Sequence, residues 1–176
     1  MYSKELETER LILRRYKYED IELYHELTND PKLLEFNYYP NTTREHEEEY
    51  VKNLVDNCDT NKYESWVIER KIDHEPVGKI NITKIIQRFN YCEVGYTIRY
   101  KYWGNGYASE ALSEVTKHLL NDIGYRLVEC VIDETNTKSI KVVEKAGFIK
   151  DGYVANRKKG SDGTYHGILY YSKSKE

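Results

Sequence analysis

The fold is decided by two neighbouring stretches of sequence, Cys92–Ile98 (CEVGYTI) and Trp103–Ala108 (WGNGYA). The first reads as a strand, and the second contains two glycines that let the backbone approach a ligand without a Cβ in the way. A helical pattern follows directly, and a helix N-terminus binds anions through unpaired N–H groups and the positive end of its dipole. Strand, glycine turn and helix in this order predict a phosphate-binding site, although a lone Gly-x-Gly is also compatible with an ordinary turn.

Length and composition limit the function classes that remain. The chain has 176 residues, a net charge of −3 and a pI of about 6.0, which suits one domain spanning residues 1–176 and disfavours nucleic-acid binding. No apolar stretch approaches the roughly 20 residues of a membrane span. The polar N-terminus lacks the apolar core of a signal peptide, so we expect a cytoplasmic protein without a membrane partner.

The cysteine pattern argues against both a disulfide framework and a metal site. Cys58, Cys92 and Cys130 are odd in number, lie far apart and form no Cys-x-x-Cys pair. We therefore expect buried free thiols and no metal.

The remaining pattern mixes strands and helices in one chain. Strands are expected at residues 10–14, 65–70, 77–83, 89–98, 126–132, 148–154 and 167–172, and helices at residues 19–27, 44–57, from the glycine turn to about 121, and 139–146. Thr43 is the expected N-cap of the second helix, and Gly124 and Gly147 are expected to end the last two. This order predicts an α+β or mixed-sheet α/β domain.

Two familiar phosphate-binding motifs fit the glycine turn poorly. The Gly-x-x-x-x-Gly-Lys-Ser/Thr loop of nucleotide hydrolases is absent. The dinucleotide motif Gly-x-Gly-x-x-Gly would come late in the chain, and Ser109 stands in place of its third glycine.

A second cluster narrows the choice. Asp133-x-x-Asn136-x-x-Ser139-x-x-Val142-x-Glu144-Lys145-x-Gly147-Phe148 follows an expected strand. Together with the two stretches above and the opening Glu7–Arg14, it resembles the GNAT acyltransferase superfamily, and within it the RimJ/RimL-like branch that acetylates ribosomal-protein N-termini. The resemblance implies the GNAT fold: a central mixed, mostly antiparallel sheet, splayed at the cofactor slot and flanked by helices.

The resemblance also implies how acetyl-CoA is held. The pyrophosphate would bind main-chain N–H groups of the loop formed by Gly104, Asn105, Gly106, Tyr107 and Ala108, with the ring of Trp103 packing beside it. Tyr96 and Ile98 would pair with the pantetheine arm as an added strand does. Asn136 matches the family's pantetheine-binding Asn, and its alternative role is that of an N-cap or Asx-turn at a helix start.

The expected chemistry is direct transfer of the acetyl group to a primary amine in a ternary complex. An amine must be neutral to attack a thioester, so Glu93 on the central strand is the candidate base, acting directly or through water; a solvated strand residue or an Arg partner is the alternative. A main-chain N–H near Ile98 would stabilise the oxyanion. Many relatives protonate the leaving thiolate with a Tyr at the place of Val143; Ser139 is the branch's substitute acid, and solvent or a merely capping Ser is the alternative.

The sequence leaves the acceptor open between a protein N-terminus and a small amine. Residues 29–59 are expected to shape its pocket, and a solvated helix face is the alternative for their acidic group; the relevant side chains are Phe36, Tyr38, Tyr39, Glu45, Glu47, Glu48 and Glu49. His25, His46, His74 and His118 are expected on the surface. Gly167 replaces an Asp that relatives often carry before the last strand. The sequence leaves open whether the protein forms a homodimer. The alternative function is that of a non-catalytic CoA-binding regulatory module, and it is favoured only by Val143 in place of the usual Tyr.

Overall fold

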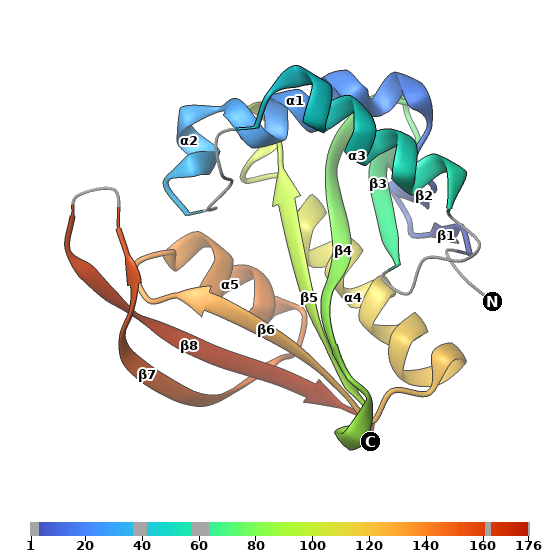
Figure 1. The fold of residues 1–176 in the computed structure, drawn as a ribbon. Helices are drawn as coiled ribbons and strands as arrows, with labels where there is room; N and C mark the ends of the chain where they lie inside the picture. The colour runs from blue at the N-terminus through green and yellow to red at the C-terminus, as the bar shows by residue number, and fades with distance from the viewer. Residues whose placement is uncertain (1–3, 37–41, 58–63, 161–162, 176) are drawn as a thin grey trace. The chain divides into compact units, whose positions relative to one another are not determined.

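The computed structural model describes residues 4–36, 42–57, 64–160 and 163–175 (Figure 1). In these residues the strands are β1 (Leu6–Glu7), β2 (Leu11–Arg14), β3 (Ser65–Arg70), β4 (Pro76–Ile86), β5 (Tyr91–Ile98), β6 (Leu127–Asp133), β7 (Ile149–Lys159) and β8 (Tyr165–Ser174). The helices are α1 (Ile21–Asn29), α2 (Pro31–Leu34), α3 (Arg44–Asp56), α4 (Tyr107–His118) and α5 (Thr137–Lys145). Short 3-10 turns lie at Tyr18–Asp20, Gln87–Phe89 and Tyr100–Tyr102, and a π-helical turn at Leu119–Ile123 extends α4.

The strands form one eight-stranded mixed sheet in the order β1-β2-β3-β4-β5-β6-β8-β7. Strands β5 and β6 run parallel, and the pairs β1–β2, β2–β3, β3–β4, β6–β8 and β7–β8 are antiparallel. A mostly antiparallel sheet flanked by helices is the fold class that the sequence predicted. The parallel register of β5 with β6 covers Tyr91–Glu93, and a splayed slot for a cofactor stays a prediction.

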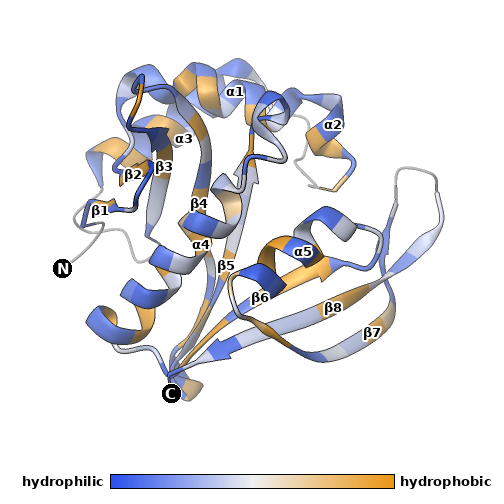
Figure 2. Ribbon diagram, turned by 180° about the vertical axis from the view of Figure 1, so that it is seen from behind, coloured by the Kyte–Doolittle hydropathy of each residue, from blue (hydrophilic) through white to orange (hydrophobic). Residues whose placement is uncertain are grey.

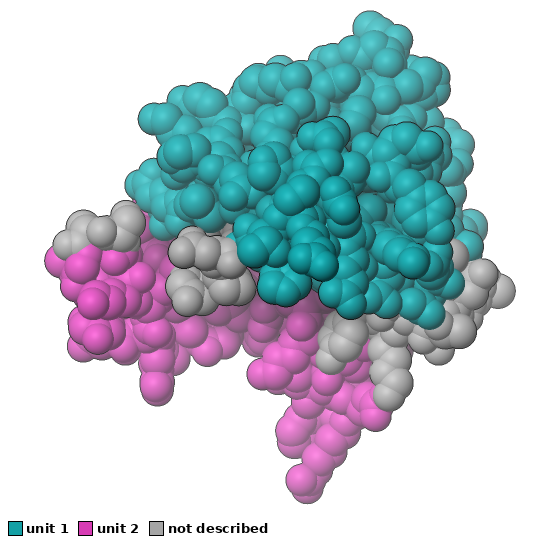
Figure 3. Space-filling view, turned by 45° about the horizontal axis from the view of Figure 1, so that its top comes forward, with its two compact units in different colours: residues 1–81, 96–107 teal, residues 82–95, 108–176 magenta. Residues whose placement is uncertain are grey.

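The chain falls into two compact units, coloured separately in Figure 3. The first contains residues 1–81 and 96–107, and the second contains residues 82–95 and 108–176. The chain crosses from one unit to the other within β4, within β5 and in the first turn of α4.

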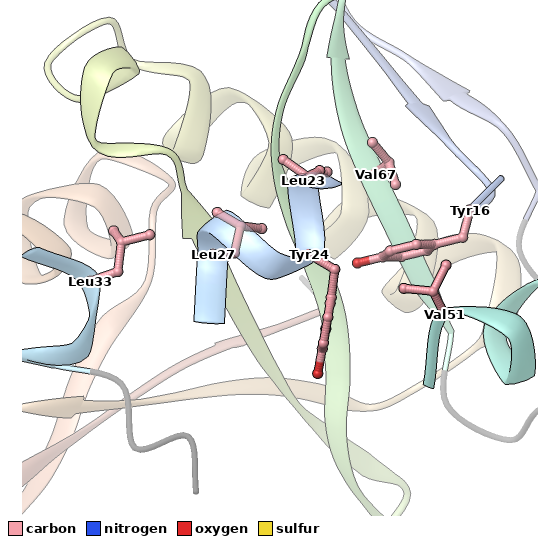
Figure 4. Close-up of a cluster of buried hydrophobic side chains, with 7 residues drawn as sticks. All are labelled: Tyr16, Leu23, Tyr24, Leu27, Leu33, Val51 and Val67. Atoms are coloured by element: carbon pink, nitrogen blue, oxygen red, sulfur yellow. The ribbon is translucent and has the colours of Figure 1, made fainter. Parts of the chain in front are cut away.

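In the first unit, α1 and α3 pack on the sheet through one cluster of buried side chains (Figure 4). Leu23, Tyr24 and Leu27 recur at helical spacing on α1, which gives that helix a single apolar face. Val51 of α3 and Val67 of β3 complete the contact, and both are almost fully buried. The predicted cap of α3 is confirmed, because the Thr43 hydroxyl accepts a hydrogen bond from the main-chain N–H of His46.

In the second unit, α5 packs against β6 and β8. Residues Val128, Cys130 and Ile132 alternate as buried positions along β6, and Val143 of α5 is fully buried. Figure 2 shows β6 as mostly hydrophobic, whereas α5 carries both hydrophilic and hydrophobic residues, as an amphipathic helix does. The carbonyl of Ala146 at the end of α5 accepts a hydrogen bond from Lys173 Nζ on β8 at 2.9 Å.

The glycines expected to end helices do so. Gly124 and Gly147 have φ angles of +91° and +82°, in the left-handed region that glycine adopts without a steric cost. Cys92 and Cys130 are buried free thiols as predicted, and Cys58 lies outside the described residues. Among the residues that the structure describes, no helix is long and apolar enough to cross a membrane.

Several boundaries differ from the sequence expectation. Strands β7 and β8 form a hairpin in which Lys158 pairs with His166. β7 therefore continues to Lys159, beyond its predicted end at 154, and β8 begins at Tyr165, before its predicted start at 167. β7 lies at the edge of the sheet and is largely exposed, so it shows no alternation of apolar residues that could reveal its length. The predicted start of the fifth strand at 89 was also wrong, because Asn90 has a φ of +50° and ends a 3-10 turn before β5.

Candidate active site

The Trp103–Ala108 loop has the geometry expected of a phosphate-binding turn. Gly104 and Gly106 have φ angles of +81° and +79°, which other residues adopt only with strain. Helix α4 begins at Tyr107, so Tyr107 and Ala108 lie in its first turn. The loop therefore ends where unpaired helical N–H groups and the dipole favour an anion.

The loop is held in this conformation by its own side chains and by Arg10. The Arg10 guanidinium donates to the Asn105 carbonyl at 3.0 Å and lies 4.9 Å above the Tyr107 ring. The Asn105 side chain donates to the carbonyls of Tyr102 and Trp103 at 3.0 and 3.3 Å. The turn is thus ordered by protein contacts before any ligand binds, which lowers the entropic cost of binding.

Trp103 connects the loop to the end of β5. Its indole Nε1 donates a hydrogen bond to the Ile98 carbonyl at 2.8 Å, and its ring and that of Tyr100 form a T-shaped pair with centroids 5.0 Å apart. The ring also packs against the buried cluster of the first unit. Sequence reasoning placed Trp103 beside the loop but missed its bond to Ile98, because nothing local in the sequence indicates which carbonyl an indole will reach.

The segment with the predicted pantetheine residues lies against a glycine of β4. Ile98 is buried and Tyr96 is half-buried. A Cβ added to Gly78 would lie 2.3 Å from the Thr97 carbonyl oxygen and 3.0 Å from the Ile98 Cα, so no side chain fits there. A glycine inside a strand pattern signals such a close backbone approach, and Gly78 could have been found from it.

In the second unit, Asn136 is the N-cap of α5. Its Oδ1 accepts a hydrogen bond from the main-chain N–H of Ser139 at 3.0 Å. The capping interpretation of Asn136 is therefore confirmed, and its contact with pantetheine stays a prediction. The Ser139 side chain is half-buried in the first turn of α5, and Val143 lies one turn further along, fully buried.

Glu93 lies in the second unit beside another carboxylate, Glu129. The two residues are register partners on β5 and β6, and both are half-buried. The Thr83 hydroxyl donates to Glu93 Oε1 at 2.7 Å. Burial, followed by the negative charge of Glu93, raises the pKa of Glu129, while Lys84 opposes the shift and Asp151 adds to it.

Sequence reasoning missed Glu129, although a charged residue in the middle of an apolar strand is a detectable signal. The buried apolar positions Val128, Cys130 and Ile132 alternate along β6, so Glu129 points to the opposite side of the sheet. Cys130 pairs in register with Tyr171, whose hydroxyl donates to Glu144 of α5 at 3.2 Å. Glu93 and Glu129 therefore share the face of the sheet that α5 does not cover.

Two expectations about exposed side chains were wrong, one at Glu47 in the expected acceptor region and one at His118 at the end of α4. Glu47 is buried and its carboxylate accepts hydrogen bonds from Thr28, Asn29 and Thr42, besides its contact with His25, so it is neither on a solvated face nor accessible to a cationic acceptor. His118 is also buried, 4 % exposed, next to Asp122. The predicted aromatic residues Tyr38 and Tyr39 lie outside the described residues.

Comparison with known proteins decides the family. The model of the acetyltransferase (GNAT) domain matches residues 10–149, which include the loop, Glu93, Asn136 and Ser139. The chain belongs to the GNAT acetyltransferase family. The uncharacterized N-acetyltransferase p20 of Bacillus licheniformis is 26 % identical over 155 residues, covering 88 % of this chain and 87 % of that protein.

Solved structures of GNAT acetyltransferases share the fold. The RimL ribosomal L7/L12 alpha-N-protein acetyltransferase in complex with coenzyme A superposes with a TM-score of 0.85 at 18 % identity, covering 97 % of this chain and 98 % of that one. The ribosomal-protein-S5-alanine acetyltransferase of Vibrio fischeri gives a TM-score of 0.84 at 21 % identity, covering 97 % and 96 %. At these identities the likeness establishes the fold. The GNAT family and the GNAT fold predicted from the sequence are both confirmed, and the RimJ/RimL-like branch stays a prediction.

Proposed function

We propose that this GNAT acetyltransferase moves an acetyl group from acetyl-CoA to a primary amine by direct transfer. The observation that carries the proposal is the glycine loop: two left-handed glycines lead into the first turn of α4, and Arg10 and Trp103 fix the loop. The loop suits a pyrophosphate, and a similar structure was solved with coenzyme A.

The cofactor is assigned to two groups of residues. Main-chain N–H groups of the loop bind the pyrophosphate; the loop residues are Gly104, Asn105, Gly106, Tyr107 and Ala108, with Trp103 beside them. The pantetheine arm pairs with β5 at Tyr96 and Ile98 and contacts Asn136. Because the Asn136 Oδ1 already accepts the Ser139 N–H, its amide Nδ2 is the atom that donates to pantetheine.

The chemistry requires removal of one proton and delivery of another. The amine nitrogen attacks the thioester carbon, the C–S bond breaks, and the departing thiolate takes a proton. Glu93 accepts the amine's proton directly or through water, and Ser139 or solvent protonates the thiolate. A base matters because an α-amino group has a pKa of about 8 and a lysine of about 10.4, so much of either acceptor is protonated at neutral pH.

The proposal is tested by an acceptor screen with acetyl-CoA that measures release of free thiol. Protein N-terminal peptides and small amines such as polyamines and amino sugars form the two arms of the screen. Turnover with any amine supports the enzyme. A folded protein that binds CoA but acetylates no amine would favour the non-catalytic CoA-binding module instead.

The role of Glu93 is tested by the pH dependence of the rate. Glu93→Gln should lower the rate most at low pH, where the amine is almost fully protonated and depends most on a base. Glu114→Gln on α4 is the matched control, since it removes a carboxylate that we place outside the reaction. An unchanged pH–rate profile in Glu93→Gln would remove Glu93 as the base.

A further inference from the structure

Asp133 is a buried carboxylate that contacts both the β7–β8 hairpin and the turn before α5, all within the second unit. It is the last residue of β6, and its side chain is only 4 % exposed. A buried charge is costly unless hydrogen bonds and opposite charges surround it. The partners of Asp133 come from two different directions.

On one side, Asp133 builds the turn that carries Asn136. Its Oδ1 accepts hydrogen bonds from the main-chain N–H of Thr135 at 2.9 Å and from the Thr135 hydroxyl at 2.7 Å. Its main-chain carbonyl accepts the N–H of Asn136, also at 2.9 Å. The Asn136 side chain then caps α5 through Ser139. The orientation of Asn136 therefore depends on the placement of Asp133.

On the other side, Asp133 contacts a lysine and a histidine of the hairpin. Lys158 Nζ on β7 lies 3.4 Å from its carboxylate, and His166 Nδ1 on β8 lies 3.3 Å from it. The Thr164 hydroxyl is hydrogen-bonded to the other ring nitrogen of His166, Nε2, at 2.9 Å. Burial raises the pKa of Asp133, but the Thr135 hydrogen bonds, His166 and Lys158 outweigh burial and lower it, so the carboxylate is ionised at neutral pH.

We propose that Asp133, held by Lys158 and His166 of the β7–β8 hairpin, is the positioning residue that presents Asn136 to the pantetheine arm of the cofactor. The proposal rests on the proposed function for the role of Asn136. Asp133 itself does not touch the cofactor. It reduces the number of conformations open to the Asp133–Asn136 turn, so that less ordering is left to be done when pantetheine binds.

The first test follows the turn without any ligand. Asp133→Asn keeps an oxygen for Thr135 but removes the charge that attracts Lys158 and His166. We expect amide hydrogen exchange at Asn136 and Ser139 to speed up about tenfold, the effect of losing a charge-assisted hydrogen bond. Unchanged exchange at both amides would overturn the proposal.

The second test compares two ligands by titration calorimetry. Coenzyme A contains the pantetheine arm, and adenosine 3′,5′-bisphosphate lacks it. We expect Asp133→Asn to raise the dissociation constant for CoA about tenfold, as loss of one such hydrogen bond would do, and to change that for the bisphosphate by no more than about twofold. The double variant Lys158→Met and His166→Gln should have the same effect. The hairpin variants keep the test available if Asp133→Asn folds poorly.

Asp151→Asn is the control, because it removes an exposed carboxylate from the same β7 strand. It should change neither the affinity for either ligand nor the exchange rates. Equal weakening of both ligands would indicate general loss of structure and overturn the proposal. A wild-type protein that binds no CoA would instead refute the proposed function, whereas the exchange experiment needs no ligand and judges the Asp133 turn by itself.

Discussion

Replacing Trp103 by Phe removes the hydrogen bond from its indole to the carbonyl of Ile98 while keeping an aromatic ring. The bond is 2.8 Å long, and the Tyr100 ring lies 5.0 Å away in an edge contact that Phe can preserve. A net loss of about 1 kcal/mol in the free energy of unfolding is expected for one such hydrogen bond. For a chain of this size, that loss lowers Tm by about 2–4 °C.

The same substitution should weaken binding of the cofactor more than a general loss of stability would. Without its link to Ile98, the loop is free to move relative to the end of β5, so pyrophosphate and pantetheine lose a preordered site. We expect the dissociation constant for CoA to rise about fivefold, which corresponds to about 1 kcal/mol. Titration calorimetry with CoA, together with thermal unfolding, measures both quantities on one sample.

Trp66 provides a matched control within the chain. Its Nε1 donates to the Lys4 carbonyl at 2.9 Å, and the side chain is fully buried on β3. Trp66→Phe should therefore lower Tm at least as much as Trp103→Phe and leave CoA affinity unchanged. If Trp103→Phe binds CoA like the wild type, or if both variants weaken CoA equally, the role given to the Trp103–Ile98 link is wrong.

Three further changes have expected outcomes. Gly78→Ala places a methyl group 2.3 Å from the Thr97 carbonyl oxygen, so we expect unfolding to become easier by about 1–3 kcal/mol and CoA binding to weaken, as measured by denaturation and calorimetry; an unaltered Tm would contradict the close approach. Burial and the charge of Glu93 raise the pKa of Glu129, so ionised Glu129 destabilises the folded state at any pH above the ordinary pKa of a Glu. Glu129→Gln should therefore raise Tm at pH 7 and lose this gain near pH 4. A gain in Tm that stays constant with pH would refute the coupling. Burial raises the pKa of Glu47, but its hydrogen bonds outweigh burial and lower the pKa, so Glu47 stabilises the fold above the ordinary pKa of a Glu and loses this effect on acidification. Glu47→Gln should therefore lower the free energy of unfolding in urea by about 1.5–3 kcal/mol at pH 7 and by progressively less toward pH 3.

Local signals in the sequence predicted much of the fold. Thr43 and Asn136 are caps because a short polar side chain reaches the N–H groups two or three residues on, which depends only on nearby sequence. Gly124 and Gly147 end helices for an equally local reason, the left-handed backbone. The glycine loop and its following helix were found in the same way.

The features that sequence reasoning missed depend on residues far apart in the chain. Glu129 meets Glu93 only through the parallel register of β5 and β6, and Glu47 is buried because α1 presents three polar side chains to it. Asp133 gains its importance from Lys158 and His166, which arrive on a hairpin whose length the polar sequence concealed. Such pairings follow from strand order and packing, which no local pattern contains.

Titration of the folded wild-type protein with CoA in a calorimeter measures whether the loop at Trp103–Ala108 holds the cofactor, as we propose. We expect saturable binding of one CoA per chain, weakened about fivefold by Trp103→Phe and unaffected by Trp66→Phe. A folded protein that gives no binding heat with CoA at several temperatures, and no Tm shift on adding it, would show that the loop does not bind CoA.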